Sequence, residues 1–164
     1  MQALTDSPFA ALTIIVAPAI LTNAASVLSL GTSNRIARVV DRTRVLASQL
    51  ADLDPASPKA LAYGEHLQRL QVRSQLLLRA LRMFYMSIGA FAAAALISVV
   101  GAVLVSTTES AGFQATAVLS LIAGTAGVFG LVLGCALMIR ETQLAVRFLE
   151  READLIRKMP LGHI

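Results

Sequence analysis

The chain has 164 residues, 56% of them hydrophobic, and a mean hydropathy of +0.71. A soluble domain of this length has too little interior to hide so much apolar surface, so the composition excludes an ordinary soluble fold. A net charge of +4 could suggest a nucleic-acid-binding protein, but the distribution of the basic residues along the chain argues otherwise. The single cysteine, Cys135, excludes both an intramolecular disulfide framework and a cysteine-built metal site.

Three stretches contain no Asp, Glu, Lys, Arg or His and are each long enough to cross a bilayer, which takes about 20 residues. They predict transmembrane helices at about 8–33, 83–108 and 114–139. The first stretch is the least apolar because it holds Pro18, Asn23 and several hydroxyl residues, and a cleaved signal peptide is the alternative interpretation. We favour a retained helix because no Lys or Arg precedes it, whereas a signal peptide begins with basic residues.

The basic residues predict the orientation. Nine of the 14 Lys and Arg lie between residues 34 and 82 and the other five lie from residue 140 onward. Since basic residues collect on the cytoplasmic side, the N-terminus is expected outside, and the middle segment and C-terminus in the cytoplasm. Arginines beside spans also contact anionic lipid head groups, which explains the high pI without nucleic acid.

The predicted fold is therefore an all-α membrane protein with three transmembrane helices, a cytoplasmic helical hairpin and a C-terminal cytoplasmic helix. Its segments are an external tail and first span (1–33), the hairpin (34–82), the second span (83–108), a short external loop (109–113), the third span (114–139) and the C-terminal helix and tail (140–164).

The hairpin is predicted from apolar residues at helical spacing. One helix runs from Arg35 to about Leu53, either as a separate helix or as a continuation of the first span, and a second begins near Lys59. Pro55 and Pro58 mark the turn between them, because proline cannot continue a helix interior. A heptad-like seam on the second helix consists of Leu67, Leu70, Ser74, Leu77 and Leu81.

Small and polar residues of the first span lie on one helical face. They are Pro18, Thr22, Ser26, Ser29 and Ser33, with Asn23 beside them. Hydroxyls and amides can line a passive pore. The spans hold no ionisable group except the thiol of Cys135, which argues against an ion-coupled pump or transporter. The alternative is that these residues let helices pack closely, which is the commoner use of such a face.

Two further groups of residues complete the candidate sites. Arg35, Arg38 and Arg42, together with Asp41, are expected at the cytoplasmic mouth of such a pore. Asp41 is three positions from Arg38 and from Arg44, so a solvated helical ion pair and an ordered ring at the mouth are both open. The residues predicted for close helix packing, within or between subunits, are Gly89, Ala93, Gly127, Gly130 and Gly134.

The runs 17–21 (APAIL) and 33–46 (SNRIARVVDRTRVL) resemble a bacterial family of small integral-membrane proteins known only as a domain of unknown function. The resemblance covers most of the chain. It implies a three-span topology and a bacterial origin, and it implies no catalytic or ligand-binding residue.

No motif in the sequence indicates catalysis, and the only histidines are His66 and His163. We therefore expect a protein that is not an enzyme and needs no cofactor or metal. The predicted function is a homo-oligomeric passive ion channel in the bacterial inner membrane, with the lipid bilayer and further copies of the chain as its partners. The alternative is a non-conducting scaffold that docks a protein partner through its cytoplasmic helices.

Overall fold

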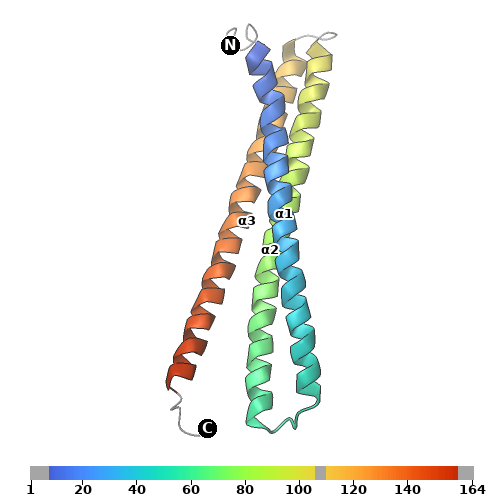
Figure 1. Ribbon diagram of the computed structural model, residues 1–164. Coiled ribbons are helices and arrows are strands. Elements are labelled where there is room, and N and C mark those ends of the chain that lie inside the picture. Colours follow the sequence, from blue (N-terminus) through green and yellow to red (C-terminus); the bar gives the residue numbers. More distant parts are fainter. Residues whose placement is uncertain (1–7, 106–109, 159–164) are drawn as a thin grey trace. The chain divides into compact units, whose positions relative to one another are not determined.

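The computed structural model of the protein describes the backbone of residues 8–105 and 110–158, and the side chains of residues 16–101, 114–148 and 150. It contains three helices, α1 (Pro8–Ala51), α2 (Pro58–Val105) and α3 (Ser110–Lys158) (Figure 1). All three are long and apolar enough to cross a membrane. This confirms the prediction of an all-helical chain with three apolar, membrane-length helices.

Each predicted span is continuous with a neighbouring polar helix. α1 runs through Ser33 and Asn34 without a break, so the first hairpin helix is an extension of the first span. α2 and α3 likewise join a span to a polar segment. α3 begins at Ser110, so residues 110–113, which we expected in an external loop, are helical. A bilayer favours this outcome because a helix bonds its backbone groups internally.

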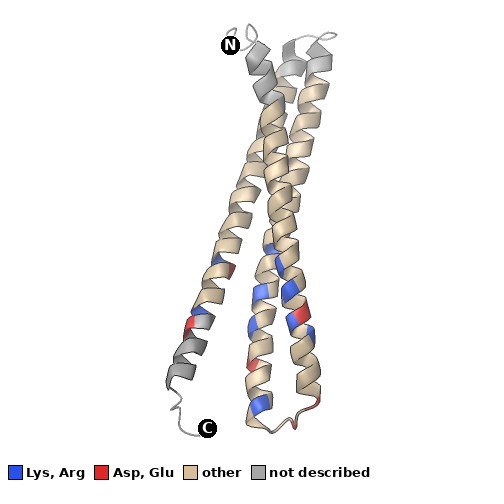
Figure 2. Cartoon of the chain, in the orientation of Figure 1, with Lys and Arg blue, Asp and Glu red and all other residues tan. Residues whose placement is uncertain are grey.

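The contacts between residues divide the chain into two units. The first, the apolar unit, comprises residues 1–33 and 81–134, and the second, the basic unit, comprises residues 34–80 and 135–164. Every Lys and Arg except Arg82 belongs to the basic unit. Figure 2 shows those of them that lie in the described part of the chain, on basic-unit segments of all three helices.

In the apolar unit, α2 and α3 pack by fitting large side chains against glycines. Phe84, Ser87 and Phe91 of α2 are buried, and they face Gly134, Gly130 and Gly127 of α3 in that order. The numbers rise on α2 while they fall on α3, so the two helices are antiparallel. A Cβ atom added at Gly127 would lie 2.6 Å from the Phe91 ring, and one at Gly130 would lie 2.7 Å from the Ser87 hydroxyl oxygen. These glycines therefore let the two backbones approach closely.

A pair of hydroxyl groups joins the same two helices further along. The side-chain oxygens of Ser98 on α2 and Ser120 on α3 are 2.6 Å apart, and Ser120 also donates to the carbonyl of Ala94 at 3.1 Å. Such bonds between helices hold polar groups in a medium that offers no water.

The outer faces of the helices stay uncovered. Only 17%, 22% and 11% of the most apolar stretches of α1, α2 and α3 are buried within the structure. Gly89 and Ala93 of α2 lie on such an outer face, and a Cβ at Gly89 would meet no atom of the described residues within 4 Å. The apolar exterior is what a lipid-exposed protein presents, since lipid carries no penalty for exposed hydrocarbon.

The turn between α1 and α2 is built from short-range bonds. The Asp54 carboxylate accepts a hydrogen bond from the backbone N–H of Ala56 at 3.1 Å. The Ser57 hydroxyl accepts one from the N–H of Ala60 at 3.1 Å and caps α2. Pro58 then occupies the first helical position, where its missing N–H costs nothing. The turn is therefore encoded within seven residues of sequence.

A small apolar core holds the basic unit together. Val39 of α1 packs with Leu70 and Leu77 of α2, and all three are buried. Ile36, Leu46 and Met138 lie against this cluster and are partly buried. Leu70 and Leu77 belong to the heptad seam expected from the sequence, and Met138 brings α3 onto the hairpin.

Candidate functional site

The hydroxyl groups of α1 in the apolar unit bond to their own helix. Thr22 donates to the carbonyl of Pro18 at 2.8 Å, Ser26 to that of Thr22 at 2.8 Å, and Ser29 to that of Ala25 at 2.9 Å. Bonds of this kind satisfy a hydroxyl without water or another helix. Because each hydroxyl donates its hydrogen in these bonds, both lone pairs of its oxygen remain available to a ligand wherever the side chain is exposed.

The residues of α1 predicted to line a pore differ in their burial. Ser29 is buried, with 4% of its surface exposed. Pro18, Thr22 and Ser33 are half-buried, and Asn23 and Ser26 are exposed. Helical spacing alone placed these residues on one face, but Ser29 turns toward the interior of the apolar unit. Any path along the outside of α1 would therefore be lined chiefly by Asn23 and Ser26.

The side-chain amide of Asn23 stands out among the exposed groups of α1. It lies near the middle of the predicted first span, and no described residue offers it a hydrogen bond. In hydrocarbon an unpaired amide costs several kcal/mol. In a membrane, Asn23 therefore requires either water or a polar group from another molecule.

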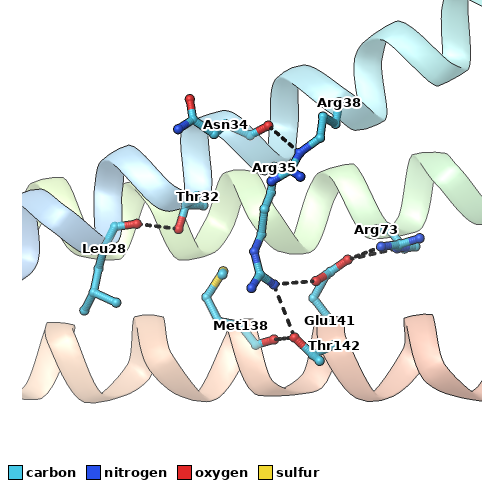
Figure 3. A network of polar contacts seen from close by, with 9 residues as sticks. All are labelled: Leu28, Thr32, Asn34, Arg35, Arg38, Arg73, Met138, Glu141 and Thr142. Carbon is cyan, nitrogen blue, oxygen red and sulfur yellow. Dashed lines mark hydrogen bonds and ion pairs between the residues drawn. The ribbon is translucent and has the colours of Figure 1, made fainter.

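The basic unit contains a buried carboxylate on which all three helices converge (Figure 3). Glu141 of α3 has a side chain only 3% exposed. Arg73 of α2 approaches its Oε1 with Nε at 2.9 Å and Nη2 at 2.7 Å. Arg35 of α1 brings Nη1 to 3.7 Å from Oε2 and also donates to the hydroxyl of Thr142 at 3.4 Å. Two guanidinium groups from two helices thus neutralise one carboxylate on the third.

Glu141 was not predicted as a site residue from the sequence. One feature of the sequence could have indicated it. Glu141 is an acidic residue next to Arg140, just after the third predicted span, where basic residues were expected. We named Asp41 instead, but Asp41 is exposed and forms no ion pair with any described residue. Arg38 directs its Nε to the carbonyl of Asn34 at 3.3 Å, within its own helix.

A hollow of about 380 Å³ lies beside the Glu141 ion pairs. We call it the arginine hollow, and its lining consists of Arg35, Arg38, Val39, Arg42, Leu70, Arg73, Leu77 and Glu141. A smaller hollow of about 70 Å³ shares Arg42, Leu70 and Arg73 with it and also meets His66 and Arg69. Three of the four residues expected at the cytoplasmic mouth, all except Asp41, therefore come together with Arg73, which was not expected there.

Arg69 lies beside the smaller hollow and is held by two contacts. Its guanidinium carbon is 5.2 Å from the centre of the Phe148 ring, and its Nη2 is 3.5 Å from the Glu65 carboxylate. Phe148 lies on α3, in the segment expected as the C-terminal cytoplasmic helix. The side chains that the structure describes include no group of three His, Cys, Asp or Glu suited to a metal ion.

The chain belongs to the family described as a protein of unknown function, DUF2721, which matches residues 15–151. The match covers most of α1 and α3 and all of α2. It confirms the resemblance seen in the first span and the basic segment after it. No curated protein and no solved structure matches the chain. Membership of this family assigns no activity to the chain.

Proposed function

We propose that this member of the family assembles into a homo-oligomer in the bacterial inner membrane and forms a passive ion channel, with α1 of each copy facing the path. The observation that carries the proposal is the exposed, unpaired amide of Asn23 in the first apolar span. The free-energy cost of leaving this amide without a hydrogen-bond partner in lipid disappears if copies of the chain meet through α1, or if water fills a path along α1.

The proposed orientation follows from the charges. Basic residues flank the spans on one side only, so the hairpin and the C-terminus face the cytoplasm and the N-terminus faces outward. Arg35, Arg38 and Arg42 then stand where α1 leaves the cytoplasmic leaflet.

A closed ring of copies would present Asn23 and Ser26 together. These residues are three positions apart on α1 and both are exposed, so they share one side of the helix. Around a symmetry axis, each amide and hydroxyl would repeat once per subunit and replace part of an ion's hydration shell. The lining is neutral, so conduction would be passive, while the arginines would raise the local anion concentration at the cytoplasmic end.

We expect Asn23→Leu to weaken the oligomer by about tenfold per subunit contact and to abolish ion flux, because an interhelical amide bond in a membrane contributes about 1–2 kcal/mol. Flux would be measured from liposomes that contain purified protein, and subunit number by native mass spectrometry. Ser29→Ala is the matched control on the same helix, since its hydroxyl is buried and bonded to Ala25. Unaltered assembly and flux in Asn23→Leu would remove α1 from the interface and the path.

The second candidate function, a non-conducting scaffold, is favoured by a separate observation. Val45 and Leu61 are exposed on the hairpin of the basic unit. A hollow of about 440 Å³ near the turn is lined by Leu50, Leu53, Pro55, Ala60, Leu61, Gly64 and Glu65. An apolar hollow of this kind can bind the apolar face of a helix from a partner protein. An intact wild-type oligomer that passes no ion under any voltage gradient would favour this function over the channel.

A further inference from the structure

The arginine hollow holds more positive charge than its carboxylate neutralises. Four arginines line it against the single acid Glu141. Arg35 and Arg73 are engaged with that acid, whereas Arg38 and Arg42 form no ion pair with any described residue. Two guanidinium groups therefore remain available for an anion from outside.

We propose that the arginine hollow is a binding site for a phosphate group. Guanidinium groups match phosphate oxygens through paired N–H donors, which makes arginine the preferred residue for this anion. The proposal concerns residues of the basic unit only and holds whether or not the protein conducts ions.

The composition of the lining supports an amphiphilic ligand as well as a free anion. Val39, Leu70 and Leu77 supply an apolar floor beneath the arginines, and they belong to the buried core of the basic unit. A hollow with an apolar floor and a charged rim can accommodate a phosphate together with the first carbons attached to it. Phospholipid head groups and free phosphate share the chemistry that the arginines recognise.

The place of Arg38 along α1 matches the depth of the lipid head groups. Arg38 and Arg42 are five and nine residues past Ser33, where the charge-free stretch ends. At 1.5 Å per residue, Arg38 is about 7.5 Å beyond that point along the continuous helix. The head-group layer of each leaflet is about 5–8 Å thick. Arg38 thus reaches the outer edge of the head-group layer, whereas Arg42, about 13.5 Å beyond Ser33, lies past it.

The test uses the full chain purified in mild detergent and two probes. In one arm, native mass spectrometry compares the retention of phosphatidylglycerol with that of phosphatidylcholine, which has no net charge. In the other arm, equilibrium dialysis measures the binding of inorganic phosphate. The test variant is R38Q/R42Q, which removes two exposed arginines that hold no carboxylate. The matched control is R44Q/R79Q, which removes the same charge from two exposed arginines that line neither hollow.

We expect R38Q/R42Q to weaken the binding of at least one probe by roughly thirtyfold, while R44Q/R79Q changes it little. A loss confined to phosphatidylglycerol identifies a lipid head group, and a loss confined to inorganic phosphate identifies a free anion. R38K/R42K keeps both charges without the paired donors, so an intermediate loss is expected. Equal effects of R38Q/R42Q and R44Q/R79Q on both probes, or no binding of either probe by the wild type, would overturn the proposal.

Discussion

Replacing Arg73 with Gln is expected to destabilise the basic unit by about 3 kcal/mol, because the buried Glu141 carboxylate loses its closest ion-pair partner. The carboxylate is 3% exposed, and its two short contacts, at 2.7 and 2.9 Å, both come from Arg73. Among the described residues, Arg35 would remain as its only charged partner, at 3.7 Å. Removing one member of a buried pair leaves an uncompensated charge, which typically costs 3–5 kcal/mol. The measurement is the free energy of unfolding in a mild detergent.

The reverse change should cost less. Glu141→Gln leaves Arg73 and Arg35 unpaired, but their side chains are 29% and 47% exposed, so water can solvate them. We expect a loss of about 1–2 kcal/mol, and R73Q/E141Q should be more stable than R73Q alone.

Arg69→Gln is the control on the same helix. Arg69 pairs with an exposed Glu65 at 3.5 Å and lies over Phe148, contacts that together contribute about 1 kcal/mol at a surface. Equal losses in Arg73→Gln and Arg69→Gln would show that the buried carboxylate does not depend on Arg73.

Substituting Ala for both Gly127 and Gly134 is expected to disrupt the packing of α2 on α3 in the apolar unit. The new Cβ atoms would enter the space of the Phe91 and Phe84 rings. Both rings are fully buried, so neither can swing aside without moving its helix. Overpacking of this kind costs about 1–3 kcal/mol per site. The measurement is the thermal midpoint of unfolding in detergent, which we expect to fall in this variant.

The controls for this prediction come from other glycines of the same helices. Among the described residues, only the Ala94 methyl group lies in reach of Gly124 of α3, 4.0 Å from an added Cβ, and none lies within 4 Å of a Cβ at Gly89 of α2. G89A and G124A should therefore leave the midpoint unchanged or raise it, since alanine favours a helix more than glycine does. Phe91→Leu combined with Gly127→Ala should recover part of the lost stability. If G127A/G134A behaves like G89A, the two glycines are not close-packing positions.

The sequence predicted the features that depend on local composition. Uninterrupted apolar stretches identified three membrane-length helices, because hydrocarbon tolerates no charge over about 20 residues. Pro55 and Pro58 marked the turn of the hairpin, since proline disfavours a helix interior but fits the first position of a helix, where Pro58 lies.

The sequence could not predict features that depend on distant partners. Asp41 seemed the natural partner of Arg38 because periodicity reveals only neighbours three or four residues away. The ion pairs that form instead join Glu141 to Arg35 and Arg73, which are 106 and 68 residues distant. Ser29 illustrates the same limit, because spacing placed it on the polar face of the first span while packing turned it inward.

The exposed turn between α1 and α2 offers a way to determine sidedness. Ala56 lies in this turn, outside both helices, and is exposed. Cys135 is the only cysteine in the chain, so Cys135→Ser combined with Ala56→Cys leaves one accessible thiol at the turn. A membrane-impermeant maleimide applied to intact cells, and separately to inverted vesicles, would label this thiol from one side only. The side that reacts is the side on which the hairpin lies.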